Sequence, residues 1–258
     1  AMTPARLFLV PTPLDFGADP QPLALALPGE TVDTAARLTH WIAENAKSAR
    51  AFLKRVDAIA PLAVPLQAQQ IAELPRQAHK QGDHAAGALD TAARALLAPA
   101  VQGHDIGLLS EAGMPAVADP GSSVVRAAHA MGLTVVPLAG PVSLMLALAA
   151  SGLNGQHFAF VGYVPQDAAA RSKRLRELEA HATRSGQTQI LIETPYRNVA
   201  LLQALLEHLQ ASTRLAVACA LGLPQQAVRS ATVAQWRQQA AWREALPLSM
   251  PAVFLFGP

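Results

Sequence analysis

The chain has 258 residues, of which 51% are hydrophobic and 15% carry a charge, and its net charge is +2 at neutral pH. These values exclude a disordered chain and predict a globular protein with one large domain or two smaller ones. The slightly basic balance allows a nucleic-acid partner without requiring one, and no apolar run is long enough to predict a membrane partner.

The N-terminal part predicts separate strands and helices. A strand is expected at 6–10, where it ends in the Pro-rich loop "PTPLDFG", and a second strand at 38–44. Helices are expected at 46–56 and 84–101. The stretch 57–83 contains Pro and Gln residues that favour neither a helix nor a strand.

The alternation of strands and helices is clearest in the middle of the chain, where apolar strands are expected at 105–110, 133–138 and 158–165. The C-terminal part continues it. Strands are expected there at 188–193, 214–221 and 251–257, and helices at 169–182, 198–210 and 233–242.

The two helices between the central strands have recognisable ends. Asp119 is expected to be the N-cap of the first helix and Pro120 its first residue, with Gly132 as its end. The second helix is expected to begin at Pro141 and to end at Gly152. It is almost wholly apolar, which indicates a position at the junction of two domains.

Strands that alternate with helices predict βαβ units and a mainly parallel sheet. Ligands of such sheets bind at the carboxyl ends of the strands. We therefore expect an α/β fold with two α/β domains, at 1–138 and 139–258.

The single cysteine, Cys219, excludes an internal disulfide, and its apolar surroundings indicate a buried strand. The first ten residues lack the pattern of a secretory signal. We therefore expect a cytoplasmic protein.

The chemistry follows first by elimination. The chain has no "GxGxxG" that opens a helix, no phosphate-binding "GxxxxGK[ST]", no "GxSxG" and no metal-ligand spacing of His or Cys, so no metal is expected. Gly- and Pro-rich loops at strand ends remain. Such loops let a ligand approach the backbone closely and suit an adenosine-like cofactor, although ordinary turns share the same composition.

These loops carry a family resemblance. The segments "RLFLVPTPLDFG", "LLSEAGMPAVADPG", "PLAGPVSLMLALAASGL", "FAFVGYVP", "ETPYR" and "MPAVFLFG" occur in this order. They resemble the bacterial 16S ribosomal RNA cytidine 2′-O-methyltransferases of the tetrapyrrole (corrin/porphyrin) methylase superfamily. The resemblance is strong from 105 to 165 and weak from 20 to 103.

The resemblance implies the two-domain fold of class III methyltransferases, with S-adenosylmethionine (SAM) in a cleft between the domains, and a homodimer. It also implies a ribosomal RNA or small-subunit partner. Carried over by motif, the residues that bind SAM are Leu14, Ala112, Gly113, Met114, Val117, Val142, Ser143, Glu193, Thr194, Leu221, Pro251 and Ala252.

A hydroxyl acceptor needs a group that takes its proton. Glu193 and Glu111 are the candidate acids beside the expected cleft, and Arg197 is a candidate partner of Glu193 or of a phosphate. Exposed acids are more often solvated caps or surface ion pairs, so the sequence leaves the catalytic residue unknown.

The chain departs from the family pattern on the acceptor side. It reads "AENAK" at 43–47 where the ribosomal enzymes carry "AEDTR". The first loop is a second departure, because it reads "PLDF". Two basic helix faces could contact RNA, one at 47–55 and one at 171–176.

These departures leave three hypotheses open. The first is a SAM-dependent methyltransferase related to ribose 2′-O-methylation, with an altered acceptor site. The second is a methylase of a tetrapyrrole-like small molecule. The third is a SAM-binding module without catalysis.

Overall fold

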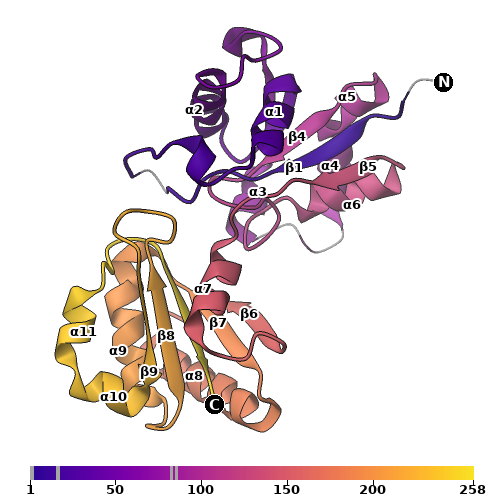
Figure 1. The fold of residues 1–258 in the computed structure, drawn as a ribbon. Coiled ribbons are helices and arrows are strands. Elements are labelled where there is room, and N and C mark those ends of the chain that lie inside the picture. The colour runs from indigo at the N-terminus through magenta and orange to yellow at the C-terminus, as the bar shows by residue number, and fades with distance from the viewer. Residues whose placement is uncertain (1–2, 16–17, 82–83, 85–86) are drawn as a thin grey trace. The chain divides into compact units, whose positions relative to one another are not determined.

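The structure is a computed structural model that describes residues 3–15, 18–81, 84 and 87–258. The chain separates into two compact units, Ala1–Pro141 and Val142–Pro258, each built on its own five-stranded sheet (Figure 1). The fold is therefore α/β with two sheets, as the sequence predicts.

The sheet of the first unit is entirely parallel, with the strand order β3-β2-β4-β1-β5. The first strand β1 pairs with the central strand β4 on one side and with β5 on the other, so Phe8 lies opposite Gly107 and Val136. The strands are β1 (Arg6–Val10), β2 (His40–Ala43), β3 (Gln70–Glu73), β4 (Ile106–Leu109) and β5 (Thr134–Pro137).

Helices cover both faces of this sheet, because its strands are apolar on both sides. Phe52 and Leu53 of α2 pack with Val32 of α1 on one face, and Val124 of α6 packs with Leu97 on the other. The helices of this unit are α1 (Gly29–Arg37), α2 (Ala46–Asp57), α3 (Arg76–Gln81), α4 (Ala88–Leu96), α5 (Ala98–Val101) and α6 (Ser122–Ala130).

Several predicted helix ends are wrong. The helix expected at 84–101 is broken at Leu97, because Pro99 has no N–H to donate to the preceding turn. Asp119 is not the N-cap of α6, and Pro120 is not its first residue. The cap is Gly121, with a φ of 138°, and the tight turns before it hold the chain out of helical geometry until Ser122.

The second unit has the strand order β6-β7-β10-β8-β9, in which β6 and β7 form a parallel pair and the other neighbouring strands pair antiparallel. The expectation of a mainly parallel sheet is therefore wrong here. A short turn reverses the chain between β8 and β9, and the last strand β10 inserts antiparallel to both β7 and β8. The strands are β6 (Phe158–Gly162), β7 (Thr188–Ile192), β8 (Arg214–Cys219), β9 (Ala227–Thr232) and β10 (Ala252–Gly257).

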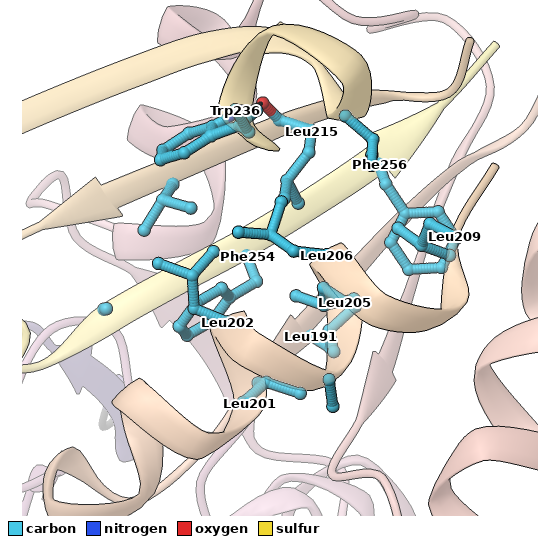
Figure 2. Close-up of a cluster of buried hydrophobic side chains, with 14 of the residues drawn as sticks. Leu191, Leu201, Leu202, Leu205, Leu206, Leu209, Leu215, Trp236, Phe254 and Phe256 are labelled. Carbon is cyan, nitrogen blue, oxygen red and sulfur yellow. Dashed lines mark hydrogen bonds between the residues drawn. The ribbon is translucent and has the colours of Figure 1, made fainter. Parts of the chain in front are cut away.

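The core of this unit lies between the sheet and α9, where Leu202 lies beside Phe254, and Trp236 of α10 extends the same cluster beside Leu215 (Figure 2). Trp236 is fully buried and donates its indole N–H to the Leu215 carbonyl over 2.9 Å, so no polar group is left unpaired by that burial. The helices are α7 (Ser143–Ser151), α8 (Ala168–Ser185), α9 (Asn198–His208), α10 (Val233–Gln238) and α11 (Ala240–Ala245).

Two further helix expectations are corrected in this unit. The apolar helix α7 begins at Ser143 with Val142 as its N-cap, so Pro141 precedes it, while Gly152 ends it in the left-handed conformation as predicted. The helix expected at 233–242 is interrupted at Gln239, whose ψ of 70° is not helical. Among the helices that the structure describes, none has both the length and the apolarity needed to cross a bilayer.

Candidate functional site

The first group of candidate site residues lies at the carboxyl edge of the parallel sheet. The loops that follow β1, β2, β4 and β5 leave the sheet at this edge, because the strands all point the same way. Two hydrogen bonds of 3.0 Å between the backbones of Thr12 and Gly113 join the first loop to the third. The Ser110 hydroxyl donates to the Gly113 carbonyl over 2.7 Å, which fixes the start of the same loop.

Gly113 stands where three of these loops meet. Its φ is 75°, and a Cβ atom at this position would lie 3.1 Å from Leu14 Cδ2 and 3.2 Å from the Pro141 carbonyl oxygen. Only glycine fits such a position without strain. The structure thus brings the predicted residues Leu14 and Gly113 into contact, with Leu14 buried beneath the loop.

The loops also hold non-glycine residues in the left-handed region. Among the described residues, positive φ outside glycine occurs at Ala116, Ala118 and Ala220, at 65°, 60° and 52°. Each costs about 1–2 kcal/mol relative to a relaxed backbone. All three lie in strand-end loops that contain predicted SAM-binding residues, and such concentrated strain is typical of functional loops.

A cavity of about 480 Å³ opens beside these loops, on the α2 side of the first sheet. Polar and charged side chains from the first loop, from the start of α2 and from the β4 loop line it. They are Thr12, Asp15, Asp19, Asn45, Ser48, Arg55, Ser110 and Glu111. Pro13 and Asp15 of the departure "PLDF" and Asn45 of "AENAK" therefore line one cavity.

An ion pair holds the first loop against α2. Arg55 donates to Asp15 Oδ2 over 2.5 Å and to the Gln21 carbonyl over 2.7 Å, and both charged side chains are mostly buried. Arg55 is thus occupied inside the protein and is not a free member of the basic face predicted at 47–55. Sequence reasoning did not find this pair, because Asp15 and Arg55 are separated by 40 positions.

Asn45 performs a local structural task at the altered "AENAK" motif. Its side-chain oxygen accepts hydrogen bonds from the backbone N–H groups of Lys47 and Ser48, over 2.9 and 3.1 Å. It is therefore the N-cap of α2, a position that favours Asn and Asp equally. The change from the family's Asp removes a negative charge from the cavity and preserves the start of the helix.

The β4 loop faces a second cavity on its other side. Met114 and Val117, both predicted to bind SAM, line an apolar cavity of about 620 Å³ together with Leu9, Ala116 and Val125. Arg126 and His129 of α6 lie at its margin. The loop 110–121 thus separates a polar cavity from an apolar one.

One acid of this loop has a raised pKa. Burial, and secondly the negative charge of Glu111, raises the pKa of the Asp119 carboxyl to about 6. Glu111 itself is exposed and lines the polar cavity. The loop therefore keeps one exposed carboxylate beside a carboxyl that takes up a proton in mildly acidic solution.

The second group of candidate residues lies at one edge of the sheet in the second unit. Register places Ile192 opposite Val253, and Cys219 opposite Ala252, so the ends of β7 and β8 meet the beginning of β10. The Ala220 N–H donates to the Pro251 carbonyl over 2.9 Å at this edge. The predicted residues gathered there are Glu193, Thr194, Leu221, Pro251 and Ala252, and Leu221 and Ala252 are buried.

Glu193, the acid at this edge, contacts neighbouring residues of its own motif, "ETPYR". Glu193 Oε1 accepts from the Thr194 N–H over 2.8 Å and lies 3.9 Å from Arg197 Nη1, with only 7% of the Glu193 side chain exposed. The Arg197 guanidinium lies over the ring of Tyr196, 4.8 Å from its centre, and Tyr196 is 76% exposed. Arg197 therefore pairs with Glu193, as the sequence suggests. It also stacks on Tyr196, whose ring is exposed to solvent.

One buried side chain at this edge escaped the sequence analysis. Asn198 is fully buried, and its amide donates to the carbonyls of Leu248 and Met250 over 3.0 and 2.9 Å. It therefore fixes the segment that leads into Pro251. Its position directly after "ETPYR", at the beginning of α9, is the signal that could have pointed to it.

The remaining predicted residues begin α7. Val142 is its N-cap and Ser143 its first residue, and the helix packs against β8, β9 and β10. Ser230 of β9 donates its hydroxyl to the Ser151 carbonyl at the far end of the helix, over 2.6 Å. Among the described residues, no group of three or more His, Cys, Asp or Glu side chains is placed to hold a metal ion.

Comparisons with known proteins give the arrangement a family. Residues 46–236 match the family described as Tetrapyrrole (Corrin/Porphyrin) Methylases. A ribosomal RNA small subunit methyltransferase I from Pseudomonas aeruginosa is 35% identical over 52% of this chain and 46% of its own length. Its counterpart from Xylella fastidiosa is 32% identical over 76% of this chain and 60% of its own length. The chain thus spans about half the length of these curated relatives.

Solved structures share the fold across nearly the whole chain. The methyltransferase CobJ matches 98% of this chain and 94% of its own, with a TM-score of 0.56 and 19% identity. A uroporphyrin-III C-methyltransferase from Thermus thermophilus, complexed with S-adenosylhomocysteine, matches with a TM-score of 0.50 and 17% identity, over 98% and 97%. At such identities the likeness concerns the fold alone. The sequence match covers more than half of the chain, which therefore belongs to the tetrapyrrole (corrin/porphyrin) methylase family.

Proposed function

We propose that this chain is a SAM-dependent methyltransferase whose acceptor is ribosomal RNA of the small subunit. The observation that carries the proposal is the junction at Gly113, where three strand-end loops meet around a position that only glycine fits. Family membership and the ribosomal RNA methyltransferases among the relatives supply the reaction and the acceptor class.

The residues present suit a cofactor of this kind. The adenine ring of SAM has flat faces that pack on apolar side chains, and the cavity beside Met114 and Val117 is apolar and of a size usual for such ligands. Gly113 is hydrogen-bonded to Thr12 and enclosed by Leu14 and Pro141, so it fixes the shape of the loops around this cavity. Leu14, Ala112 and Gly113 would hold the cofactor in the first unit. In the second unit the residues would be Val142, Ser143, Glu193, Thr194, Leu221, Pro251 and Ala252.

SAM supplies a methyl group on a sulfonium, which needs no further activation. The chain must then orient the acceptor and receive a proton from its hydroxyl. Glu111 is the better candidate for the proton acceptor, because it is exposed and lines the polar cavity. Glu193 is engaged by Thr194 and Arg197, which suits a positioning role.

The surface supports an RNA acceptor. Exposed Tyr196, with a guanidinium stacked on one face, offers its other face to an unpaired base, and Arg197 supplies a cation for the adjoining phosphate. The helices α2 and α8 add exposed cations that can contact the RNA backbone: Lys47, Arg50, Lys54, Lys173, Arg174 and Arg176.

A tetrapyrrole acceptor is the second candidate, and the fold shared with uroporphyrin-III C-methyltransferases favours it. A SAM-binding module without catalysis is the third, and the altered "AENAK" motif favours it. A homodimer and a cytoplasmic location complete the proposal, on the support of the family resemblance.

The deciding experiment combines binding and transfer. Calorimetry measures SAM affinity, and tritium transfer from labelled SAM is measured on naked 16S ribosomal RNA, on assembled small subunits and on uroporphyrin III. We expect SAM binding and incorporation into ribosomal RNA, with incorporation abolished in Glu111→Gln and SAM affinity kept.

Each other result has a defined meaning. Incorporation into uroporphyrin III alone selects the tetrapyrrole acceptor. SAM binding without transfer to any acceptor selects the non-catalytic module. An absence of SAM binding rejects all three hypotheses. Sedimentation equilibrium tests the dimer.

A further inference from the structure

The polar cavity of the first unit has an unusual charge balance. Among the described residues that line it, the acids are Asp15, Asp19 and Glu111, and the one cation is Arg55. The Arg55 guanidinium is already bound to Asp15 and to the Gln21 carbonyl. Asp19 and Glu111 are exposed, and neither takes part in an ion pair within the described part of the chain. The cavity therefore presents negative charge that no cation of its own lining neutralises.

The helix beside the cavity does not offset this charge. An anion commonly binds at a helix N-terminus, where backbone N–H groups point outward. At the N-terminus of α2 the Asn45 side chain already accepts from the N–H groups of Lys47 and Ser48. Lys47 itself is exposed and is not among the residues that line the cavity. The N–H groups that could bind an anionic ligand are thus already occupied, and the carboxylates of Asp19 and Glu111 would repel it.

Thr12, a residue of the cavity lining, carries a buried polar atom that has no hydrogen-bond partner among the described residues. Thr12 is only 5% exposed, and its hydroxyl makes no hydrogen bond with any described atom. A buried hydroxyl without a partner costs about 1–3 kcal/mol, so its retention beside a cavity indicates a ligand that completes it. The hydroxyl can both donate and accept.

We propose that this cavity selects its occupant by charge. It admits a neutral or cationic group of about nucleobase size that carries hydrogen-bond donors, and it excludes phosphates and carboxylates. The carboxylates of Asp19 and Glu111 accept the donors of the ligand, and the Thr12 hydroxyl supplies a further contact.

This inference rests on the proposed function, because the occupant is taken to be part of the methyl acceptor. Applied to RNA, it places a base in the cavity and keeps the phosphates outside it. Applied to the alternative acceptor, it disfavours a polycarboxylate tetrapyrrole. A unit charge about 5 Å from a carboxylate at the surface is repelled enough to change affinity by about tenfold.

The test is a comparison of matched probes on the full chain with S-adenosylhomocysteine present in excess. Calorimetry at low salt measures the affinities of cytidine and guanosine, of their 5′-monophosphates, and of uroporphyrin III. Adenosine is left out because it would compete for the cofactor site. We expect each nucleoside to bind about tenfold more tightly than its monophosphate, and uroporphyrin III not to bind.

Variants then assign the effect to residues. In Asp19→Asn/Glu111→Gln the preference for the nucleoside over the monophosphate should shrink to about threefold or less. The control is Asp33→Asn, an exposed acid of α1 outside the cavity, which should leave the preference unchanged. Thr12→Val should weaken nucleoside binding about fivefold without lowering the thermal unfolding temperature, because the hydroxyl has no internal partner to lose.

Several results would overturn the inference. Monophosphates that bind as tightly as nucleosides would do so, as would binding of uroporphyrin III, or an absence of nucleoside binding in a protein that still binds S-adenosylhomocysteine. A preference that survives the double substitution would assign the selection to other residues and reject the roles of Asp19 and Glu111. Loss of S-adenosylhomocysteine binding is a separate result, which counts against the proposed function instead.

Discussion

The strand-end loops of the two sheets are built from similar residues and leave different groups exposed. Both contain Gly, Pro and an alanine held at positive φ. In the first unit, two exposed acids line a cavity, and Thr12 of the same lining has a buried hydroxyl without a partner among the described residues. In the second, Glu193 is held by Thr194 and the neighbouring Asn198 by two carbonyls. The first edge therefore leaves acids available to a polar ligand, whereas the second edge holds its acid and amide in place and exposes the Tyr196 ring.

The largest expected effect tests the first edge at its centre. Gly113→Val should lower the free energy of unfolding by about 2–4 kcal/mol and abolish SAM binding, because a branched side chain meets Leu14 and Pro141 at a φ of 75°. Urea denaturation and calorimetry measure the two losses. The control is Gly132→Val, which has a similar φ of 73° and open space around it. Gly132→Val should lose only the stability that backbone strain at positive φ removes, and it should keep SAM affinity. Equal losses in the two variants would contradict the role of Gly113.

A pair of arginine substitutions compares the two edges directly. Arg55→Met should cost about 1–3 kcal/mol of stability, because it removes two short hydrogen bonds and leaves Asp15 mostly buried without its partner. Arg197→Met should cost less than about 1 kcal/mol, since its 3.9 Å ion pair is long and the arginine side chain is 32% exposed. Urea denaturation measures both. Equal stability losses would remove the distinction between a structural arginine and one available to a ligand.

The aromatic platform of the second edge provides the next prediction. Tyr196→Ala should weaken binding of single-stranded ribosomal RNA fragments by about 5- to 150-fold, which corresponds to about 1–3 kcal/mol for one stacked base. Fluorescence anisotropy measures the affinity. Tyr196→Phe keeps the ring and should bind like the wild type, so a loss of the same size in both variants would point to the hydroxyl instead of stacking.

The last comparison concerns pH. Burial, and secondly Glu111, raises the pKa of the Asp119 carboxyl from its ordinary value of 3.8 to about 6, so the folded state binds the proton more tightly than the unfolded state. Its contribution to stability is therefore greatest below about pH 4 and is lost as pH rises to about 6. Compared with the wild type, Asp119→Asn should gain stability across this window and keep that gain above it. Urea denaturation between about pH 4 and 7 measures the difference, and a constant difference would contradict the assignment.

Much of the fold could be predicted from local signals. Apolar strands such as 105–110 and 188–193, and helices that begin and end at recognisable residues, identify the α/β class. The strand β9 has no such signal, because Ala227–Thr232 contains small and polar residues without alternation. The antiparallel order of the second sheet was missed for the same reason, since it depends on where β9 and β10 insert.

The candidate site shows a similar division. Motif resemblance locates loops, and the structure gathers the predicted residues at one edge of each sheet. The ion pair between Asp15 and Arg55 joins positions far apart in the sequence, so no local pattern predicts it. The free hydroxyl of Thr12 depends on which partners are absent in the folded protein, and this information exists only in three dimensions.

The two-bond bridge between Thr12 and Gly113 has a consequence for the order of events on this protein. It ties together the loops that line both cavities, with Thr12 on the wall of the polar one and Met114 next to the bridge on the wall of the apolar one. A ligand that shifts or rigidifies the wall of one cavity then changes the free energy of binding in the other cavity. Because such coupling is reciprocal, cofactor and acceptor should raise or lower each other's affinity by the same factor.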